Sequence, residues 1–378
     1  MKHIKIISSL LIAGMALASC RDEYVAPLVD SDTNILVVEG NLDASGGITS
    51  IRLSRSGKID GYNTIIAEDG AQIQVEAESG GVQGIPDAGG GFYRNTLALQ
   101  VGQKYRVRIL TDNGNEYLSN YITVKETPPI DSITWKRDAE GIVISANAHD
   151  DNGNTTYYRW DYDETWEIRT YYFSLYLYES LTNTVRKRDI PAEQVTTCWK
   201  YNSSSNILLA SSARLQSDRI AEAPLLRAFN GDERMAVRYS ILVRQYAMEK
   251  EAYEFYDLMK KNTESIGSIF DPQPSEIRGN FTCLTDEREP VIGHVTASTV
   301  TEKRIFISAA DLDNWRLVEN CPVQEVTPDS IEFYFKGEGF MPYDVKENNG
   351  AIELYYGSYA GCVDCRRRGG SLQRPSYW

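Results

Sequence analysis

Histidine is scarce in this chain: three occur in 378 residues, and one of them, His3, lies close to the N-terminus. Histidine is the side chain that most often exchanges protons near neutral pH. The sequence also has no Gly-x-Ser-x-Gly or His-Glu-x-x-His motif and no phosphate-binding glycine loop. We therefore predict a protein that is not an enzyme and that needs no cofactor and no metal ion. Hydrolases that use only carboxylates remain an alternative, because they need no histidine.

Clusters of basic residues and long apolar runs are also few. No run of Lys and Arg is longer than three residues, and the net charge is -14. Because so acidic a surface repels phosphate backbones, we expect no nucleic-acid partner. The one long apolar run, Ile6–Ala18, is too short to span a bilayer, which takes about 20 residues. With Lys2 and Lys5 near its start, this run predicts a signal peptide over residues 1–19.

The signal peptide ends in Leu17-Ala18-Ser19-Cys20, which resembles the lipobox of bacterial lipoproteins. In that motif the cysteine thiol is acylated and the peptide is cut, so that Cys20 becomes the N-terminus. Several acyl chains on one residue anchor a protein firmly, since each buried methylene adds about 0.8 kcal/mol. We expect Cys20 to be lipidated and residues 20–33 to form a tether to the outer membrane.

Three charged residues follow the cysteine: Arg21, Asp22 and Glu23. An acidic pair at this position resembles the surface-export signal of Bacteroidota-type outer-membrane lipoproteins, so we predict that the protein faces the cell surface. The alternative is a solvated charge cluster that leaves the lipoprotein on the periplasmic side.

Short segments of alternating polarity follow the tether, which is typical of half-buried strands. They cover residues 35–40, 51–54, 73–77, 105–110 and 117–124. Asn113-Gly114, between the last two, favours a hairpin with a type I′ turn, whose two central residues have positive φ. The pattern predicts an immunoglobulin-like β-sandwich over residues 34–127. It ends at Pro128 and Pro129, because proline cannot continue a central strand.

The remaining residues, 130–378, predict a larger β-rich domain. Aromatic side chains alternate with Arg and Asp from Tyr157 to Tyr162, as on a strand with one buried face and one wet face. Residues 248–262 carry apolar side chains at helical spacing, with charges on the other side, and predict one amphipathic helix. The predicted fold class is therefore mainly β.

Five cysteines follow Cys20: Cys198, Cys283, Cys321, Cys362 and Cys365. In an oxidising compartment we expect them to form structural disulfides that staple the C-terminal tail. Five choices of the free cysteine, with three pairings of the other four, allow 15 connectivities, and the sequence does not choose among them. The CxxC spacing of the last two cysteines also suits a redox pair or a zinc site, but the strand-then-helix context of a redox pair is missing.

Two clusters could carry chemistry. Four carboxylates lie in one segment: Asp161, Asp163, Glu164 and Glu167. A glycosidase uses such a pair to flank a sugar, but carboxylates bonded to Arg159, Arg169 or backbone amides are the commoner arrangement. The segment 149–154 has oxygen ligands at alternate positions, as calcium loops do, yet it lacks their downstream glutamate, and an Asn-Gly turn explains the same residues.

Four aromatic side chains are candidates for contact with a ligand or partner: Trp160, Trp166, Tyr171 and Tyr172. Exposed Trp and Tyr are enriched at binding hot spots. Packing in the core is the alternative for each of them.

Several blocks of the sequence resemble one known family. The most specific block runs from Lys261-Asn262-Thr263-Glu264 through residues 267–275 to Gly279-Asn280. The others are residues 157–160, 164–167, 239–246, 251–253, 290–293, 362–366, 369–370 and 375–378. Together they resemble the outer-membrane lipoprotein family called domain of unknown function 4249, across essentially the whole mature chain. The resemblance implies a partner of a TonB-dependent transporter and supplies no catalytic residues.

These features together predict a non-enzymatic outer-membrane lipoprotein that assists a TonB-dependent transporter or captures its ligand, a glycan or a peptide. Two alternatives stay open on the sequence alone. One is a stand-alone glycan-binding surface lipoprotein, and the other is a carboxylate-dependent glycan hydrolase.

Overall fold

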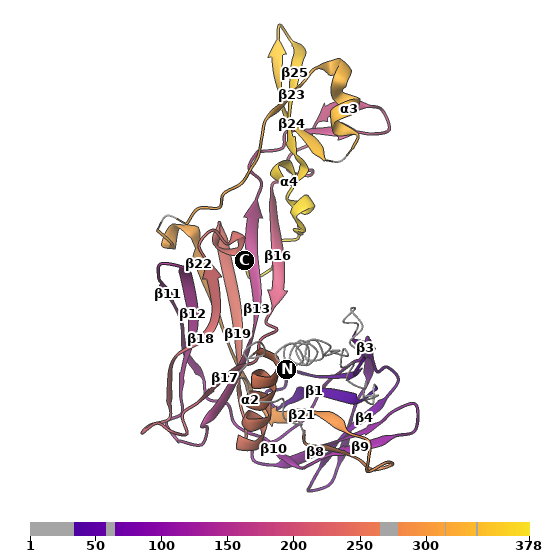
Figure 1. Cartoon of the computed structure of the whole chain (residues 1–378), viewed down its shortest axis with the longest axis vertical. Helices are drawn as coiled ribbons and strands as arrows, with labels where there is room; N and C mark the ends of the chain where they lie inside the picture. Colours follow the sequence, from indigo (N-terminus) through magenta and orange to yellow (C-terminus); the bar gives the residue numbers. More distant parts are fainter. Residues whose placement is uncertain (1–33, 58–64, 265–278, 314, 338) are drawn as a thin grey trace, which may run out of the picture.

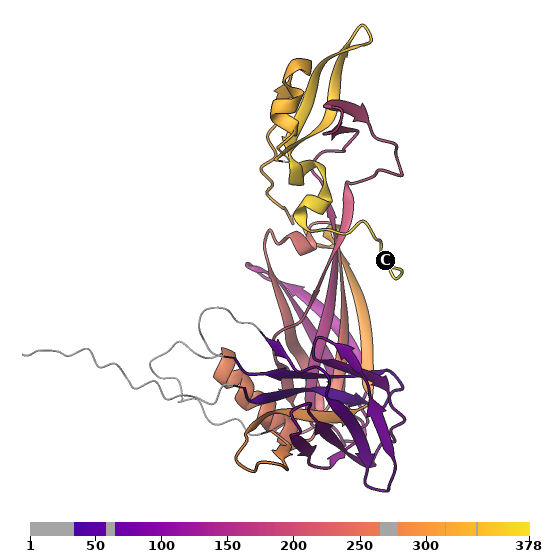
Figure 2. The same cartoon turned by 90° about the vertical axis from the view of Figure 1, so that its right-hand side faces the viewer.

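A computed structural model describes residues 34–57, 65–264, 279–313, 315–337 and 339–378. The predicted signal peptide, Cys20, the export signal at residues 21–23 and the tether lie outside the described residues. The molecule is elongated and has three parts: a first β-sandwich at one end, a second with long strands in the middle, and a small distal lobe (Figure 1). Figure 2 shows that the strands of the first sandwich run crosswise to the long strands of the second.

The first sandwich consists of two six-stranded sheets. One has the order β21-β1-β2-β7-β6 with β3 beside β2, and the other has the order β20-β9-β8-β4-β5 with β10 beside β8. The strands are β1 Leu36–Asp43, β2 Ile48–Arg55, β3 Ile66–Ala67, β4 Gln72–Ala77, β5 Val82–Ile85, β6 Asp87–Gly89, β7 Phe92–Thr96, β8 Lys104–Leu110, β9 Glu116–Ser119, β10 Ile122–Thr123, β20 Phe281–Cys283 and β21 Val291–Ser298. Inward residues alternate with outward ones, as Leu36 and Val38 do on β1, and this confirms the predicted β-sandwich.

The predicted boundary of this sandwich needs a correction. Strands β20 and β21 lie within residues 130–378, yet they complete the first sandwich. Strand β21 pairs in parallel with β1 from Leu36 opposite Val291 to Asp43 opposite Ser298. Pairing between segments this far apart leaves no local signal in the sequence, which is why residues 34–127 are not the whole unit.

The hairpin of β8 and β9 is confirmed, but its predicted turn type is wrong. Leu110 pairs with Glu116, so five residues connect the strands. Gly114 has a φ of 86°, whereas Asn113 is not among the residues with positive φ. The side chain of Asn113 instead accepts a hydrogen bond from the backbone N–H of Asn115 (3.1 Å). The polar side chains thus stabilise a longer loop than the two-residue turn that Asn-Gly favours.

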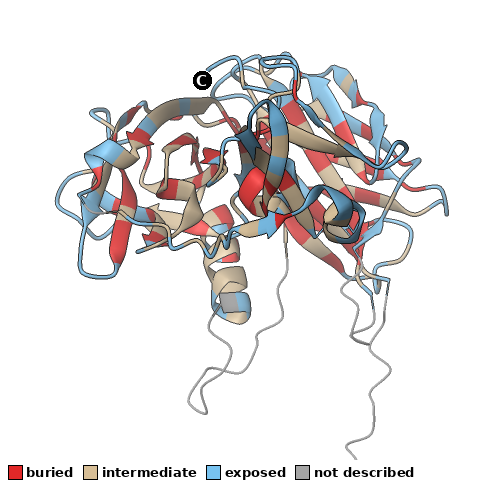
Figure 3. Ribbon diagram, turned by 90° about the horizontal axis from the view of Figure 1, so that it is seen from above, coloured by how far each residue is buried: buried red, intermediate tan, exposed pale blue. Residues whose placement is uncertain are grey.

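The second sandwich packs a sheet of order β16-β13-β19-β22, with β17 beside β13, against a sheet of order β11-β12-β18. Its strands are β11 Ile130–Arg137, β12 Gly141–His149, β13 Tyr157–Arg169, β16 Thr197–Ser203, β17 Leu208–Ser211, β18 Arg219–Phe229, β19 Arg238–Ala247 and β22 Val300–Ser308. The central strand β13 carries the aromatic segment, whose even-numbered residues Tyr158, Trp160 and Tyr162 enter the core. In Figure 3, buried residues (red) alternate with intermediate ones (tan) along strands of the molecule.

Helix α2, Lys250–Glu264, is the amphipathic helix predicted at residues 248–262. Its apolar side buries Ala252 and Phe255. The hydroxyl of Tyr256 donates a hydrogen bond to the carbonyl of His294 on β21 (3.0 Å). The helix also contacts β13 and β17, so it packs against both sandwiches at their junction.

The distal lobe contains a hairpin, a three-stranded sheet and short helices (Figure 1). Its elements are β14 Tyr176–Glu179, β15 Thr184–Lys187, β23 Gln324–Val326, β24 Phe340–Asn348, β25 Ala351–Tyr359, α3 Ile331–Phe335 and α4 Ala360–Val363, with short 3-10 turns η3 Pro328–Ser330 and η4 Cys365–Arg368. Two further 3-10 turns, η1 Glu233–Met235 and η2 Ala309–Asp311, belong to the second sandwich. Among the described residues no helix combines the length and the apolar character that crossing a membrane requires.

Two disulfides confirm the predicted stapling of the C-terminal region. Cys198 on β16 is joined to Cys365, and Cys321 is joined to Cys362. The two cysteines of the CxxC pair thus bond to different partners and not to each other. Cys283 is free and buried in the first sandwich. The bridges attach η4 to the second sandwich and α4 to the chain that enters the lobe.

A candidate ligand cleft between the two sandwiches

A cleft of about 720 Å³ lies where the first sandwich meets the second. The first sandwich contributes β1, β2 and the loop between them, and the second contributes β13, β19 and the start of β22. The lining residues are Gly40, Asn41, Asp43, Ser45, Gly46, Gly47, Ile48, Ser50, Arg159, Asp161, Arg244, Tyr246, Val300 and Glu302. The volume falls in the range of small-molecule sites, roughly 300–1,000 Å³.

The alternation of strand β13 places polar groups in this cleft. Because Trp160 and Tyr162 point into the core, their neighbours Arg159 and Asp161 point the opposite way, towards the first sandwich. The strand beside it, β19, presents Arg244 and Tyr246 in the same way. One face of the sheet that contains β13 and β19 thus packs in the core of the second sandwich, and the other face forms a wall of the cleft.

Arg244 is the fully paired cation of the cleft. Its guanidinium lies 2.8 Å from the carboxylate of Asp161 and 3.2 Å from that of Glu302, and it also bonds to Asp163. Burial opposes the charge of Arg244, but its bonds to Asp161 and Asp163 outweigh burial and raise its pKa. This arginine therefore ties β13 to β22 and offers little to a ligand.

Arg159 is different. Its guanidinium lies 4.5 Å from the ring centroid of Tyr246 and 5.3 Å from that of Tyr256, a cation–π arrangement. Among the residues that the structure describes, no carboxylate forms an ion pair with Arg159, and its buried Nε has no hydrogen-bond acceptor. The buried Nδ2 of Asn41, on the opposite wall, also lacks a partner within this part of the chain. Two donors of one cleft are therefore unsatisfied.

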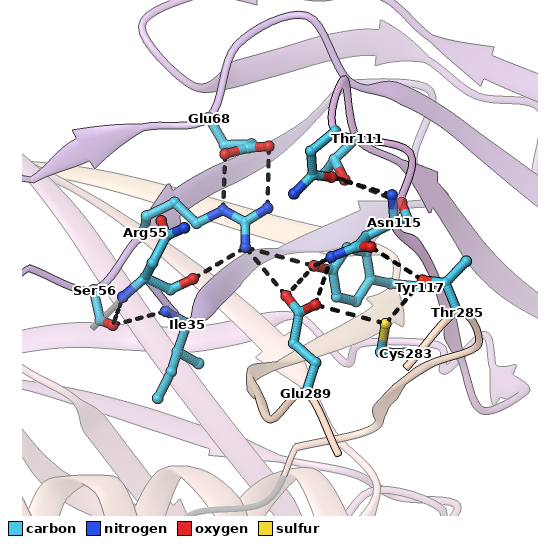
Figure 4. A network of polar contacts seen from close by, with 12 residues as sticks. Ile35, Arg55, Ser56, Glu68, Thr111, Asn115, Tyr117, Cys283, Thr285 and Glu289 are labelled. Atoms are coloured by element: carbon cyan, nitrogen blue, oxygen red, sulfur yellow. Dashed lines mark hydrogen bonds and ion pairs between the residues drawn. The ribbon is translucent and has the colours of Figure 1, made fainter. Parts of the chain in front are cut away.

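A buried arginine of the first sandwich, Arg55, has hydrogen-bond acceptors within the protein and contrasts with Arg159 (Figure 4). Arg55 forms two hydrogen bonds to Glu68, at 2.8 and 3.2 Å, and another to Glu289 at 3.3 Å. It also donates to the carbonyl of Asn34 (3.1 Å). The hydroxyl of Tyr117 donates to Glu289. The network joins β2 and β9 to the segment between β20 and β21, so its role is to hold that segment in the first sandwich.

The four clustered carboxylates are divided between the two faces of β13, with Asp161 and Asp163 on one face and Glu164 on the other. Asp163 and Glu164 are consecutive on β13 and point to opposite faces of its sheet, so they cannot flank one ligand. Glu164 is 1% exposed and accepts bonds from Arg234 (2.8 Å) and Tyr239 (2.7 Å). Glu167 accepts bonds from Arg169 (2.7 Å) and from the indole of Trp378. Asp161 is the one member of the cluster that lines the cleft.

The four aromatic candidates lie in different environments. Trp160 is 2% exposed and donates to Gln245 (2.9 Å), so it is a core residue and its prediction as a contact is wrong. Trp166 is partly buried and donates to Glu233 (3.2 Å). Tyr172 stacks on Tyr343 with ring centroids 4.1 Å apart. Tyr171 is 61% exposed and lines a separate hollow of about 340 Å³, so it is the most accessible of the four.

The segment 149–154 is a turn between strands. The carboxylate of Asp150 accepts hydrogen bonds from the backbone N–H groups of Asn152, Asn154 and Thr155. The ring of His149 lies 2.7 Å from Asp131, which raises the pKa of this histidine. The described residues contain no group of three or more side chains arranged to hold a metal ion.

The residues that matter most in the cleft were not singled out from the sequence. Arg159 entered there as a partner for nearby carboxylates, and Asn41 and Arg244 carried no signal of their own. The alternation of residues along β13 is the feature of the sequence that could have identified Arg159. Once Trp160 is assigned to the core, its neighbour Arg159 must lie on the opposite face of the sheet. The contribution of β1 and its loop could not be anticipated, because it depends on how the two sandwiches meet.

The chain is similar to one protein family and to several solved structures. The family described as "Domain of unknown function (DUF4249)" matches residues 21–304, so the blocks from residue 362 onward lie outside the match. No curated protein matches the chain. Among solved structures, a two fibronectin type-III domain segment from chicken tenascin is 12% identical and covers 57% of this chain and 91% of that chain, with a TM-score of 0.15.

Proposed function

The chain belongs to the family described as domain of unknown function DUF4249, and we propose that this member is a lipid-anchored ligand-capture protein of the outer membrane. In this proposal it is not an enzyme. It binds a ligand in the cleft between the sandwiches and assists a TonB-dependent transporter at the cell surface. The single observation that carries the proposal is the cleft, because its walls come from two sandwiches and its donors Arg159 and Asn41 are unsatisfied.

The anchor is supported by the sequence. The lipobox-like segment that ends at Cys20 and the acidic pair Asp22 and Glu23 are the features of an exported lipoprotein. The first described residue is Asn34, in the first sandwich, so a tether of about a dozen residues would separate this sandwich from the membrane.

The distal lobe supports a protein partner. Leu181, between β14 and β15, is fully exposed, and Phe333 on α3 is 85% exposed. Apolar side chains this accessible are costly to leave in water, and a protein partner that covers them would remove this cost. In the proposal these side chains contact the transporter, while the cleft holds the ligand.

Affinity isolation of the tagged full chain from detergent-solubilised outer membranes tests the proposal. We expect a TonB-dependent barrel protein to be recovered with the wild type and with a Lys346→Ala control on β24 of the same lobe. We expect recovery to fall strongly with Leu181→Ser/Phe333→Ser, because both exposed apolar contacts are lost. Recovery of no barrel protein would contradict the transporter association, and equal recovery with all three chains would contradict the role of the lobe.

The two alternatives gain no support from the geometry. A stand-alone glycan-binding protein needs several accessible aromatic faces, and of the four predicted contact residues only Tyr171 is exposed, whereas Trp160 and Trp166 are buried or partly buried. A carboxylate hydrolase needs two carboxylates that face one substrate, but Asp163 and Glu164 face opposite ways, and Asp161 and Asp163, which share a face, are both bonded to Arg244. Retention of the protein on polysaccharide gels would support glycan binding. Hydrolysis of any member of a glycan panel would support the hydrolase.

A further inference from the structure

We propose that the cleft binds the oxyanion of its ligand, a carboxylate or a phosphate, through the guanidinium of Arg159, with Asn41 as a second donor. The inference deepens the proposed ligand-capture role and rests on it. It names the chemical class of the ligand, which neither the sequence nor the family supplies.

The carboxylates of the cleft are paired within the protein, whereas Arg159 is not. Every carboxylate that lines the cleft already accepts a bond from the protein: Asp161 and Glu302 from Arg244, and Asp43 from the backbone N–H of Ser45. Within the described residues, Arg159 has no such acceptor. A partly buried guanidinium without an acceptor is costly, because desolvation of a charge is offset only by pairing. An anion from outside the protein would supply the missing acceptor.

Two aromatic rings fix the position of the Arg159 guanidinium. The rings of Tyr246 and Tyr256 lie against its guanidinium and hold it by cation–π contacts. The N–H groups of a guanidinium lie in its plane and form a rigid fork that matches the two oxygens of a carboxylate or phosphate. Because the aromatic contacts fix the group without using these N–H donors, Arg159 is pre-organised to bind an oxyanion.

A second arginine of the same strand pair, Arg238, can be compared with Arg159. Arg238, on β19, is also held by two aromatic rings, Phe306 at 4.4 Å and Trp378 at 5.2 Å. Like Arg159, it has no ion pair among the described residues, but it lines none of the clefts described above. It packs beneath the C-terminal residues on the outer face of the sheet. Arg238 is therefore a matched control: the same side chain and the same stacking, without a cleft.

The test is calorimetric titration of the detergent-solubilised full chain with two probes, D-glucuronate for a carboxylate and inorganic phosphate. We expect saturable binding of at least one probe by the wild type. Arg159→Met removes the donors and keeps the aliphatic stem, so affinity should fall about tenfold or more, as expected for the loss of a charge-assisted bidentate contact. Arg238→Met should bind as the wild type does. The probe that the wild type binds and that Arg159→Met binds more weakly identifies the oxyanion as a carboxylate or a phosphate.

Asn41→Asp keeps the proposal testable if Arg159→Met does not fold. Aspartate retains the oxygen that accepts bonds from Thr296 (2.8 Å) and Ser298 (3.3 Å), but it adds a negative charge to the cleft wall. We expect this variant to bind the same probe more weakly. Absence of saturable binding of both probes by the wild type, or equal affinity in wild type and cleft variants, would overturn the inference. If a barrel protein is isolated but no probe binds, the ligand class fails and the transporter association stands.

Discussion

Asp163 and Glu164 are neighbours on β13, but they contribute very differently to stability. Glu164 is buried and accepts bonds from Arg234, Tyr239 and Asn202. The side chain of Asp163 is 40% exposed and bonds to Arg244 and Ser203. Alternation along the strand thus separates a buried ionic network from a solvated one.

We predict that Glu164→Ala lowers the free energy of unfolding by about 3 kcal/mol or more, because it leaves the buried hydroxyl of Tyr239 without its acceptor and leaves Arg234 with Asp232 alone. Asp163→Ala should cost less than about 1 kcal/mol, as exposed ion pairs do. Urea denaturation of the two variants measures the difference. Equal losses would show that the two carboxylates do not differ in environment.

His294 supports a prediction about pH. It lies on β21 beneath α2, with its ring centroid 5.4 Å from that of Phe255, and burial lowers its pKa below the usual 6.5. The unfolded chain therefore takes up a proton at a higher pH than the folded one. The stability that His294 contributes is complete above about pH 6.5 and is lost as the pH falls through the lowered pKa.

The measurement is the unfolding free energy of the wild type and of His294→Gln between pH 5 and pH 8. We predict that the difference between the two proteins shrinks as the pH falls. His149 has the opposite shift, since Asp131 raises its pKa, and the comparison with His294→Gln removes its contribution because both proteins carry it. A difference independent of pH would contradict the role of burial at this position.

Among the elements, the disulfide between β16 and η4 connects residues 167 positions apart in the sequence. We predict that Cys198→Ala/Cys365→Ala lowers the stability of the second sandwich by about 2–4 kcal/mol, chiefly because the bridge restricts the unfolded chain. Thermal melts with and without a dithiol reductant measure the effect. The melt of the first sandwich should change less, because it contains no disulfide among its described residues, and equal changes in both would contradict this assignment.

Elements that follow from a local sequence pattern could be predicted, whereas elements that depend on contacts between distant segments could not. The alternation at β8 and β9 and the helical spacing at α2 are local, so their positions follow from the sequence. The length of the loop at Gly114 depends on side-chain bonds that compete with the favoured turn. The disulfide pairing depends on where η4 meets β16, which no spacing of cysteines reveals.

The candidate site shows the same limit. The sequence contains the residues of β13 in the right alternation, so the core role of Trp160 and the outward direction of Arg159 could be inferred. The cleft itself needs Asn41 and Asp43 of the first sandwich to lie opposite β13. That arrangement follows from packing between two units, which periodicity along the chain does not encode.

At the scale of the whole molecule, the chain leaves the first sandwich after β10 and returns to it with β20 and β21. Residues 34–127 alone therefore lack β21, which is one of the two partners of β1, and β20, which is one of the two partners of β9. Unpaired edges and missing core residues such as Phe281 and Val295 leave apolar surface in water.

We predict that a fragment of residues 34–127 does not fold cooperatively and that a fragment in which residues 279–299 are joined to it by a flexible linker does. Circular dichroism melts and amide proton dispersion in NMR spectra distinguish the two. A cooperative melt of the shorter fragment would show that the first sandwich does not need the returning strands.

The proposed function and the proposed ligand class together require that the cleft between the sandwiches hold an anionic ligand while the protein is anchored at the outer membrane. Native mass spectrometry of the full chain extracted from outer membranes tests this most directly, with Arg238→Met as the control. We predict that the wild type and Arg238→Met carry the same bound anionic molecule and that Arg159→Met does not. An unliganded wild type, or the same ligand on all three proteins, would contradict it.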